Sequence, residues 1–580
     1  MKDFLKMTLA VVFGFIIMTI LGIIICTGLI GSAFSSASPA PSSPGEGVLK
    51  IDLSKFTLAE QSRELDPFSS IQGESGPTVG IWDAVQAINA AALDPAVKFI
   101  YLKPDGSSAG LATLSEFRKA LQNFRETSGK AIVSYSEFPT TSGYWLASAA
   151  DKVYTTSHPG GGTGIVGIGS QLFFLGDLLR EFGVNVQVIR HGKYKSYGEM
   201  YTRNSASPEN REQYQVMISS VWATISSDIA SSRGITVTAL NEAIDNLELC
   251  LPQDLVDAGL ADETMDRSAL EDKLTALAVK EKFKDVKFIS FPDYVNAKKD
   301  VSKSKQKIAV IYAQGDIVME NDPDNVGGDR FASVIEKVRR DDNIKAVVLR
   351  VNSPGGSVLA SEKIKQQLDL LGEEKPLIAS YGDYAASGGY WISANCNKIF
   401  SDAVTLTGSI GVFGIVPDLS RTIKEKLHIG VETVNSNKHT DMQSLTRPLD
   451  EDEYAYMLRS IEDIYDRFTT IVSQGRGIPK EQVDEIGQGR VWTGTDALGL
   501  GLVDEIGTLE DAVHYACVAA GDAELSNWKI KSYPTPRSNM EQVMEKINGT
   551  DTDYSVMVKE LRNLKSMKAL ARLPYEVKFY

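Results

Sequence analysis

The strongest constraint on the fold is an internal repeat, because two ordered copies of one pattern require two copies of one structural unit. The copies are offset by about 245 residues in a chain of 580 residues. The matches keep their order over almost the full length of both copies, so chance is a poor explanation. The matched segments are 97–102 with 344–349, 130–135 with 375–380, 141–145 with 387–391, 163–167 with 407–411, 233–234 with 476–477, and 259–263 with 501–505.

Each copy alternates short apolar strands with amphipathic helices, which is typical of an α/β unit with strands buried between helices. Glycine-bearing turns follow the strands, where open α/β sheets usually place their sites. We therefore expect a tandem duplication of one α/β domain, with an N-terminal domain at residues 47–300 and a C-terminal domain at residues 301–535. Residues 536–580 have helical patterning, so we expect a helical tail that packs on the protein or binds a partner.

The N-terminus carries a short positive segment and a long apolar one. Lys2 and Lys6 precede an almost wholly apolar run from residue 7 to about residue 31. Roughly 20 apolar residues span a bilayer, whereas the core of a cleaved signal peptide has about 7–15. We expect residues 1–31 to be a retained transmembrane anchor with a cytoplasmic N-terminus. The Ser/Pro/Ala-rich residues 32–46 would be a flexible linker to domains outside the cytoplasmic membrane.

Charge and composition argue against several functions. The formal net charge of −15 argues against a nucleic-acid partner, since phosphate binding needs clustered Lys and Arg. The four cysteines have no C-x-x-C spacing, and the five histidines have no metal-ligand spacing. We expect neither a metal ion nor an organic cofactor.

Ser387 stands in a cluster of small residues, 385–389, between two other glycine-bearing turns. Gly356 belongs to the turn that follows the apolar run 344–351, and Ser409 belongs to the turn at 407–414. Glycine lets backbone N–H groups come close to a ligand, so a serine here could attack a carbonyl while N–H groups hold the oxyanion. The alternative is that Ser387 merely caps the helix that follows.

The two copies differ at this point. Thr141 stands opposite Ser387, and Lys195 stands opposite Thr440, so a duplicated enzyme could divide one active site between its halves. A lysine base must lower its pKa from about 10.4 to about 7, which costs about 4.6 kcal/mol and can be achieved by burial. Lys193 and Lys195 would point to the same side of an extended segment, so spacing does not choose between them. The alternative is that both are solvated surface lysines.

Several rare motifs in the right order resemble the signal peptide peptidase A (protease IV) family, in its long, duplicated, membrane-anchored bacterial form. The likeness covers about residues 47–535. One departure is Tyr197-Gly198-Glu199-Met200 after Lys195-Ser196, where the family commonly reads Ala-x-Glu-Pro. The matching motifs are Asn-Ser-Pro-Gly-Gly-Ser at 352–357, the segment 382–391, Thr-Gly-Ser-Ile-Gly at 407–411, and Tyr-Lys-Ser at 194–196.

The resemblance implies a ClpP/crotonase-type fold and a Ser/Lys dyad. By resemblance, Ser387 is the nucleophile, Lys195 is the general base, and Ser409 orients the lysine. Gly356 and Gly388 would supply the oxyanion N–H groups. The family also implies a homotetramer, cleaved signal peptides and other apolar peptides as substrates, and a bacterial inner-membrane location with the catalytic domains on the periplasmic side.

Two other functions compete with a membrane-anchored endopeptidase. A crotonase-like enzyme would polarise acyl-CoA thioesters with the same glycine N–H groups, but CoA is cytoplasmic and the chain carries an apparent export signal. A decayed membrane scaffold would retain the fold without activity, and the loss of the serine from the first copy makes decay conceivable. The intact segment around Ser387 argues against decay.

Overall fold

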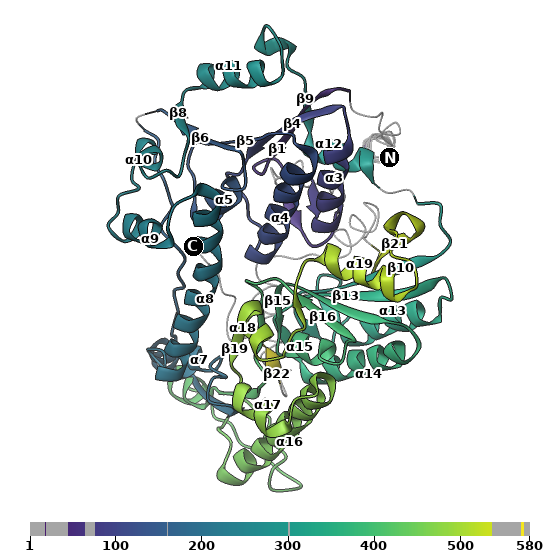
Figure 1. Cartoon of the computed structure of the whole chain (residues 1–580). Coiled ribbons are helices and arrows are strands. Elements are labelled where there is room, and N and C mark those ends of the chain that lie inside the picture. The colour runs from purple at the N-terminus through teal and green to yellow at the C-terminus, as the bar shows by residue number, and fades with distance from the viewer. Residues whose placement is uncertain are drawn as a thin grey trace, which may run out of the picture.

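The computed structural model describes residue 18 and residues 45–63, 76–158, 160–299, 302–535 and 570–572. We call residues 45–299 the first half and residues 302–535 the second half. Each half forms an α/β unit, and the two lie against each other (Figure 1). The long helix α8 (Pro208–Arg233) descends from the first half toward the lower end of the second (Figure 1).

Two parallel sheets repeat the same strand order, as the internal repeat predicts. The first has the order β8-β6-β5-β4-β1-β9, and the second contains the matching path β20-β16-β15-β13-β10-β21. The second sheet also carries β17, parallel to β15, and β19, antiparallel to β17. The bounds are β1 Gly47–Asp52, β4 Val97–Lys103, β5 Ile132–Ser136, β6 Lys152–Thr156, β8 Glu263–Met265, β9 Phe288–Ser290, β10 Lys307–Gln314, β13 Ile344–Ser353, β15 Leu377–Ala386, β16 Lys398–Ser401, β17 Leu406–Gly408, β19 Val491–Thr493, β20 Glu505–Ile506 and β21 Lys529–Tyr533.

The helices repeat in the same way, and their apolar faces bury the central strands between layers. Helix α19 of the second half packs against α3 of the first, so one hydrophobic cluster spans both halves, and a second cluster lies mainly within the second half. The bounds are α3 Ile81–Leu93, α4 Leu111–Ser128, α5 Thr141–Ala147, α6 Gly176–Glu181, α7 Glu199–Thr202, α9 Val237–Asp245, α10 Pro252–Asp257, α11 Arg267–Leu277, α12 Phe291–Lys298, α13 Gly328–Arg340, α14 Val358–Glu374, α15 Gly388–Ser393, α16 Glu451–Arg476, α17 Lys480–Ile486, α18 Gly494–Gly499 and α19 Leu509–Ala519.

The duplication extends to single hydrogen bonds. Tyr144 Oη donates to Leu260 O in the first half, and Tyr390 Oη donates to Leu502 O in the second. The lysine that precedes β5 or β15 likewise donates to two carbonyls near the end of a helix in each half. Such matching bonds indicate one ancestral unit, because tertiary hydrogen bonds between distant segments do not recur by chance.

One strand of the first half leaves its own sheet and joins the second half. Strand β7 (Asn185–His191) pairs antiparallel with β18 (Val412–Asp418), with Asn185 opposite Asp418 and His191 opposite Val412. The same mixed sheet has the order β12-β11-β14-β22-β18-β7. Its other strands are β11 Ile317–Val318, β12 Val326–Gly327, β14 Gly355–Ser357 and β22 Leu570–Arg572, and a separate pair is formed by β2 Thr57–Ala59 and β3 Thr78–Gly80.

The predicted anchor and most of the predicted tail fall outside the described residues. Within the described part of the chain, no helix is long and apolar enough to cross a membrane. The predicted anchor at 1–31 is represented there by Met18 alone, so its structure is not described. In the tail, residues 570–572 form a strand, and the stretches with the helical pattern lie outside the described residues.

Candidate active site

Ser387 occupies a sharp turn between a strand and a helix. It directly follows β15 and precedes α15, with φ 54° and ψ −113°. A positive φ is disfavoured for a non-glycine residue and costs of order 1–3 kcal/mol, so the surrounding structure must impose it. The Ser387 N–H donates to Gly408 O at 2.8 Å, and Trp391 N–H donates to Ser387 O at 2.8 Å.

The side chain of Ser387 does not cap the helix. The residue is at the N-cap position of α15, but its hydroxyl makes no capping hydrogen bond. The side chain is fully buried and points instead to an amine from the other half of the chain. The capping alternative for this serine is therefore wrong, and its hydroxyl is available for chemistry.

Lys195 reaches Ser387 because β7 crosses between the halves. After β7 ends at His191, a turn brings Lys195 N–H to Gly192 O at 3.3 Å, and Tyr194 N–H donates to Gln488 O at 2.9 Å. Arg190 then holds the lysine backbone, since its Nη1 donates to Lys195 O at 3.0 Å. Lys193 is exposed, so the structure brings Lys195 and not Lys193 to the serine.

The Lys195 amine has three close oxygen neighbours and no carboxylate among them. Nζ lies 2.8 Å from Ser387 Oγ, 2.9 Å from Ser409 Oγ and 3.1 Å from Ser409 O. All three residues are fully buried. Burial alone holds the pKa of the lysine well below its usual range, because desolvation disfavours the charged amine. A lysine desolvated in this way can present a neutral amine to a serine hydroxyl.

Two glycines lie close to Lys195: Gly411, from the motif at 407–411, and Gly489, which the sequence analysis missed. A Cβ on Gly489 would lie 2.7 Å from both Lys195 N and Lys195 Cβ, and one on Gly411 would lie 3.3 Å from Lys195 Cδ. Gly489 also has a φ of +78°, which favours glycine. The Phe413 ring centroid lies 6.0 Å from Nζ. The segment Gly-Gln-Gly-Arg at 487–490 was the available signal, but nothing in the sequence connects it to Lys195.

The buried carboxylate of Glu199 supports the turn that carries the lysine. Glu199 Oε2 accepts from Ser207 N at 3.0 Å and from Asn210 Nδ2 at 3.2 Å. Ser196 Oγ donates to Asn210 Oδ1 at 2.9 Å, so the residue after the lysine is held by the same amide. Arg190 Nη1 lies 3.6 Å from Glu199 Oε1. Glu199 thus supports the lysine-bearing turn, although the sequence after Ser196 departs from the family pattern.

The two predicted oxyanion glycines belong to two elements that contact each other, β14 and α15. Gly388 directly follows Ser387 and begins α15. Gly356 lies in β14, where a Cβ would fall 2.0 Å from Ile317 O, so only glycine fits. Strand β14 contacts α15, and a Cβ on Gly389 would lie 2.7 Å from Ser353 O. The segments that carry these glycines are therefore in contact, with no room for a side chain at Gly356 or Gly389.

The matching position in the first half has different bonding. Thr140 caps α5 by accepting from Gly143 N at 3.3 Å. Thr141 Oγ1 accepts from Val166 N at 3.1 Å and lies 3.4 Å from Gly164 O. The threonine hydroxyl is therefore committed to the backbone of its own loop. Within the described residues, the predicted lysine contacts Ser387 and Ser409 of the second half, and not Thr141 of the first.

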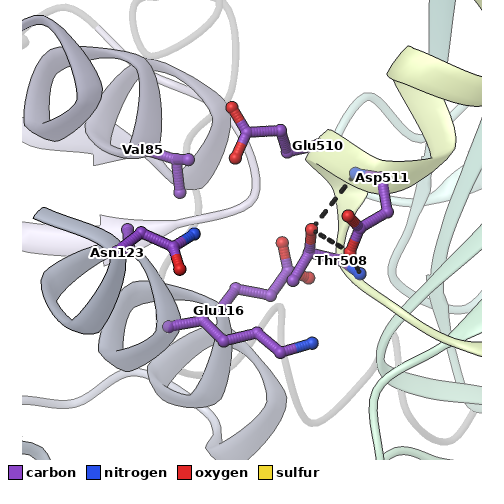
Figure 2. Close-up of a pocket in the computed structure, with 8 residues that line it drawn as sticks. Val85, Glu116, Asn123, Thr508, Glu510 and Asp511 are labelled. Carbon is purple, nitrogen blue, oxygen red and sulfur yellow. Dashed lines mark hydrogen bonds between the residues drawn. The ribbon is translucent and has the colours of Figure 1, made fainter. Parts of the chain in front are cut away.

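Two other features of the described residues could suggest a site. His439, Asp450 and Glu453 could together hold a cation, but Arg447 donates to both Glu453 oxygens and lowers the pKa of that carboxyl to about 2. A cavity of about 250 Å³ lies between α3, α4 and α19 (Figure 2). None of the predicted site residues lines it. Its lining is Val85, Glu116, Lys119, Ala120, Asn123, Thr508, Glu510 and Asp511.

Comparison with known proteins gives a consistent family match. The model of "Peptidase family S49" matches residues 123–281 and again residues 369–521. "Protease 4" of Haemophilus influenzae is 33% identical over 521 residues, covering 86% of this chain and 83% of that protein. "Protease 4" of Salmonella typhi is 35% identical over 487 residues, covering 81% of this chain and 76% of that protein.

A plant relative and a solved structure are also similar. "Serine protease SPPA, chloroplastic" of Arabidopsis thaliana is 32% identical over 440 residues, covering 73% of this chain and 64% of that protein. A structure of a ClpP1 mutant from Listeria monocytogenes covers 35% of this chain and 94% of its own, at 16% identity and a TM-score of 0.24. That likeness is too low to carry an argument about the fold.

Proposed function

The chain belongs to peptidase family S49 and is a serine peptidase, and we propose that Ser387 is its nucleophile and Lys195 its general base. The observation that carries this proposal is the buried Nζ atom of Lys195, 2.8 Å from Ser387 Oγ. A base must lie within hydrogen-bond reach of the proton that it removes, and its pKa must allow a neutral form. The short distance and the lowered pKa of the lysine support this assignment.

The contacts of the amine suit a neutral lysine with one free lone pair. A neutral amine has two N–H groups, which can donate to Ser409 Oγ and Ser409 O at 2.9 and 3.1 Å. The lone pair then points to the Ser387 hydroxyl proton. Ser409 thereby orients the base without changing its charge. It has a φ of 50°, and its N–H donates to Arg490 O at 2.7 Å.

The reaction follows from these positions. Ser387 Oγ attacks the scissile carbonyl while its proton passes to Lys195 Nζ, and the N–H groups of Gly356 and Gly388 hold the resulting oxyanion. The protonated amine then gives its proton to the leaving nitrogen as the C–N bond breaks. In the second step, Lys195 takes a proton from water, and the hydroxide formed attacks the acyl ester. The proton returns to Ser387 Oγ as the acid product leaves.

We propose that substrates bind as an extended strand where β22 lies. Strand β22 sits between β14 and β18, with Ala571 opposite Gly356 and Leu570 opposite Phe413. Main-chain pairing of this kind gives affinity that depends little on side-chain identity. It suits apolar peptides of varied sequence, such as cleaved signal peptides. The family match favours this peptide chemistry over the alternative of acyl-CoA processing.

The wider setting is also part of the proposal. We propose that residues 1–31 anchor the protein in the bacterial cytoplasmic membrane, with two ClpP/crotonase-type domains on the outer side assembled as a homotetramer. The apolar run at the N-terminus supports the anchor, and the family resemblance suggests the homotetramer. Alkaline extraction of membranes tests it, because the full chain should stay with the lipid and a chain without residues 1–31 should be released. Release of the full chain would contradict an integral anchor.

Labelling of Ser387 by a fluorophosphonate tests the catalytic pair. We expect labelling to increase with pH around a midpoint well below the usual lysine pKa, since only the neutral amine activates the serine. Lys195→Ala should abolish labelling. Lys193→Ala is the matched control, because that exposed lysine two residues away should leave labelling unchanged. Labelling that survives Lys195→Ala would rule out this base.

A further inference from the structure

A break in strand pairing lies just before the proposed site. Strands β13 and β15 pair at Val351 with Tyr381 and again at Ser353 with Ala385. One residue of β13 therefore stands opposite three residues of β15. Asn352 is the residue at the break, and its Oδ1 accepts from Tyr384 N at 3.1 Å. A side-chain amide thus replaces the missing strand hydrogen bond in a bulge of the kind that redirects strands near active sites.

The other end of the same amide contacts both halves of the chain. Asn352 Nδ2 donates to Asp383 Oδ2 at 3.3 Å within the second half and to Glu60 Oε1 at 3.0 Å from the first half. Glu60 is 2% exposed. A Cβ on Gly382 would lie 2.4 Å from Glu60 Oε1, so glycine is required for this carboxylate to reach the bulge. The amide is therefore held from three sides.

The carboxylates around Asn352 are the same groups that join the halves. Glu60 accepts from Arg350 Nε at 2.7 Å, and Arg350 Nη2 lies 2.6 Å from Glu116 Oε1. In the opposite direction, Asp383 Oδ1 accepts from Ala112 N at 2.8 Å. Helix α4 has no capping side chain of its own, so the second half supplies its N-terminal acceptor. Charged contacts thus cross the interface in both directions beside the bulge.

We propose that Asn352 is a positioning residue that links docking of the first half to the placement of Gly356 and Ser387. The inference rests on the proposed function. Asn352 lies four residues before Gly356, and its partner Tyr384 lies three residues before Ser387. The first half also carries Lys195. Through its hydrogen bond to Glu60, Asn352 therefore contacts the same half of the chain that supplies the proposed base. Docking of the first half on the second then places the nucleophile and the oxyanion donors at the same time.

Asn352→Leu tests this role, with Asn397→Leu as the matched control. Asn397 Oδ1 also accepts from a β15 backbone group, Leu377 N at 2.8 Å, but at the opposite end of that strand. The discriminating readout is kcat per site titrated with fluorophosphonate, because a purely structural loss lowers the titrated fraction and leaves this value unchanged. We expect a fall of about 10- to 100-fold for Asn352→Leu, since a displacement of about 1 Å can cost about 100-fold. We expect no change per site for Asn397→Leu.

Asn352→Asp keeps the test decisive if the leucine variant fails to fold. An ionised Asp at this position faces Glu60 and Asp383, with Arg350 already bound to Glu60 and Glu116. It lacks the donor, whereas a protonated Asp restores an O–H group at the same place. The ratio of variant to wild-type kcat per site should therefore rise as the pH falls from about 8 to about 5. The ratio removes the common contribution of Lys195.

The results separate this inference from the proposed function. If the wild type is neither labelled at Ser387 nor active on peptides, the proposed function fails. If the wild type is active and both Asn352 variants keep wild-type kcat per site, with a flat ratio over pH, the positioning role is overturned. A fall in kcat per site for Asn397→Leu equal to that for Asn352→Leu would also overturn it.

Discussion

Gly489→Ala gives a sharp test of how the lysine is held. The new Cβ would lie 2.7 Å from Lys195 N and Cβ and 2.9 Å from Lys195 Cα. Carbon atoms at optimal contact are about 3.5–4.0 Å apart, so the lysine backbone must move by about 0.8 Å or more. The contacted atoms are mainly backbone, and a side-chain rotation cannot relieve the clash. The Nζ atom moves with the turn that carries it.

The expected effects on activity and stability can be separated. A displacement of about 1 Å costs about 100-fold in rate, so kcat per titrated site should fall by about 100-fold. The φ of +78° adds a stability cost of about 1–2 kcal/mol for alanine. Gly477→Ala is the matched control, since Gly477 has a φ of +66° and no atom lies within 4 Å of the place that its new methyl group would take. The control should lose stability and keep its kcat per site.

The assay combines peptide hydrolysis with fluorophosphonate titration and chemical denaturation. Unchanged kcat per site in Gly489→Ala, with an unchanged pH profile, would show that this contact does not position Lys195. An equal loss of kcat per site in Gly477→Ala would show that backbone strain, and not the clash, causes the effect. Either result would refute the reasoning.

Three further predictions concern buried charge and the tail. Lys195→Met should be inactive, yet its Tm at about pH 6 should exceed that of the wild type, because the substitution removes a desolvated amine of lowered pKa. The difference in Tm should shrink toward pH 10, where the lysine of the unfolded chain also loses its proton. Burial raises the pKa of Glu116 to about 7 despite Arg350, so wild-type stability should fall by about 3 kcal/mol as pH rises from about 4.5 to about 7, and denaturant titration of Glu116→Gln should lack this fall. Arg572→Glu removes the ion pair with Asp316 (3.0 Å), so β22 should compete less well for the proposed substrate position. We expect KM for peptides to fall about two- to fivefold at constant kcat. An unchanged KM would contradict that competition.

Much of the fold was predictable because the sequence contains two copies of the same structural unit. Matching apolar runs predict one α/β unit, and its second occurrence supports each assignment of the first. The pattern around Ser387 likewise predicts a glycine-bearing turn after a buried strand, as found. The tandem family match agrees with the predicted duplication.

The relation between the halves was not predictable from local pattern. Alternation along an extended strand puts Lys193 and Lys195 on one side, but β7 ends at His191 and the turn that follows separates them. The contact of Glu60 with Arg350 joins residues 290 positions apart, and Glu60 stands in no repeated motif. The glycines at 487 and 489 indicate a turn, but the sequence does not show that this turn contacts Lys195. Sequence periodicity reports which face is buried, and it does not report what covers that face.

The pairing of β7 from the first half with β18 of the second also sets the order in which the proposed site can form during synthesis. The lysine is made first, and the serine follows 192 residues later. At about 5–20 residues per second, a ribosome needs about 10–40 s to cover that interval. A nascent chain therefore carries the proposed base for many seconds before the proposed nucleophile is made, and the two can meet only after β18 has been made to pair with β7. In a chain divided in this way, the proposed catalytic pair cannot assemble until part of the second half has been synthesised.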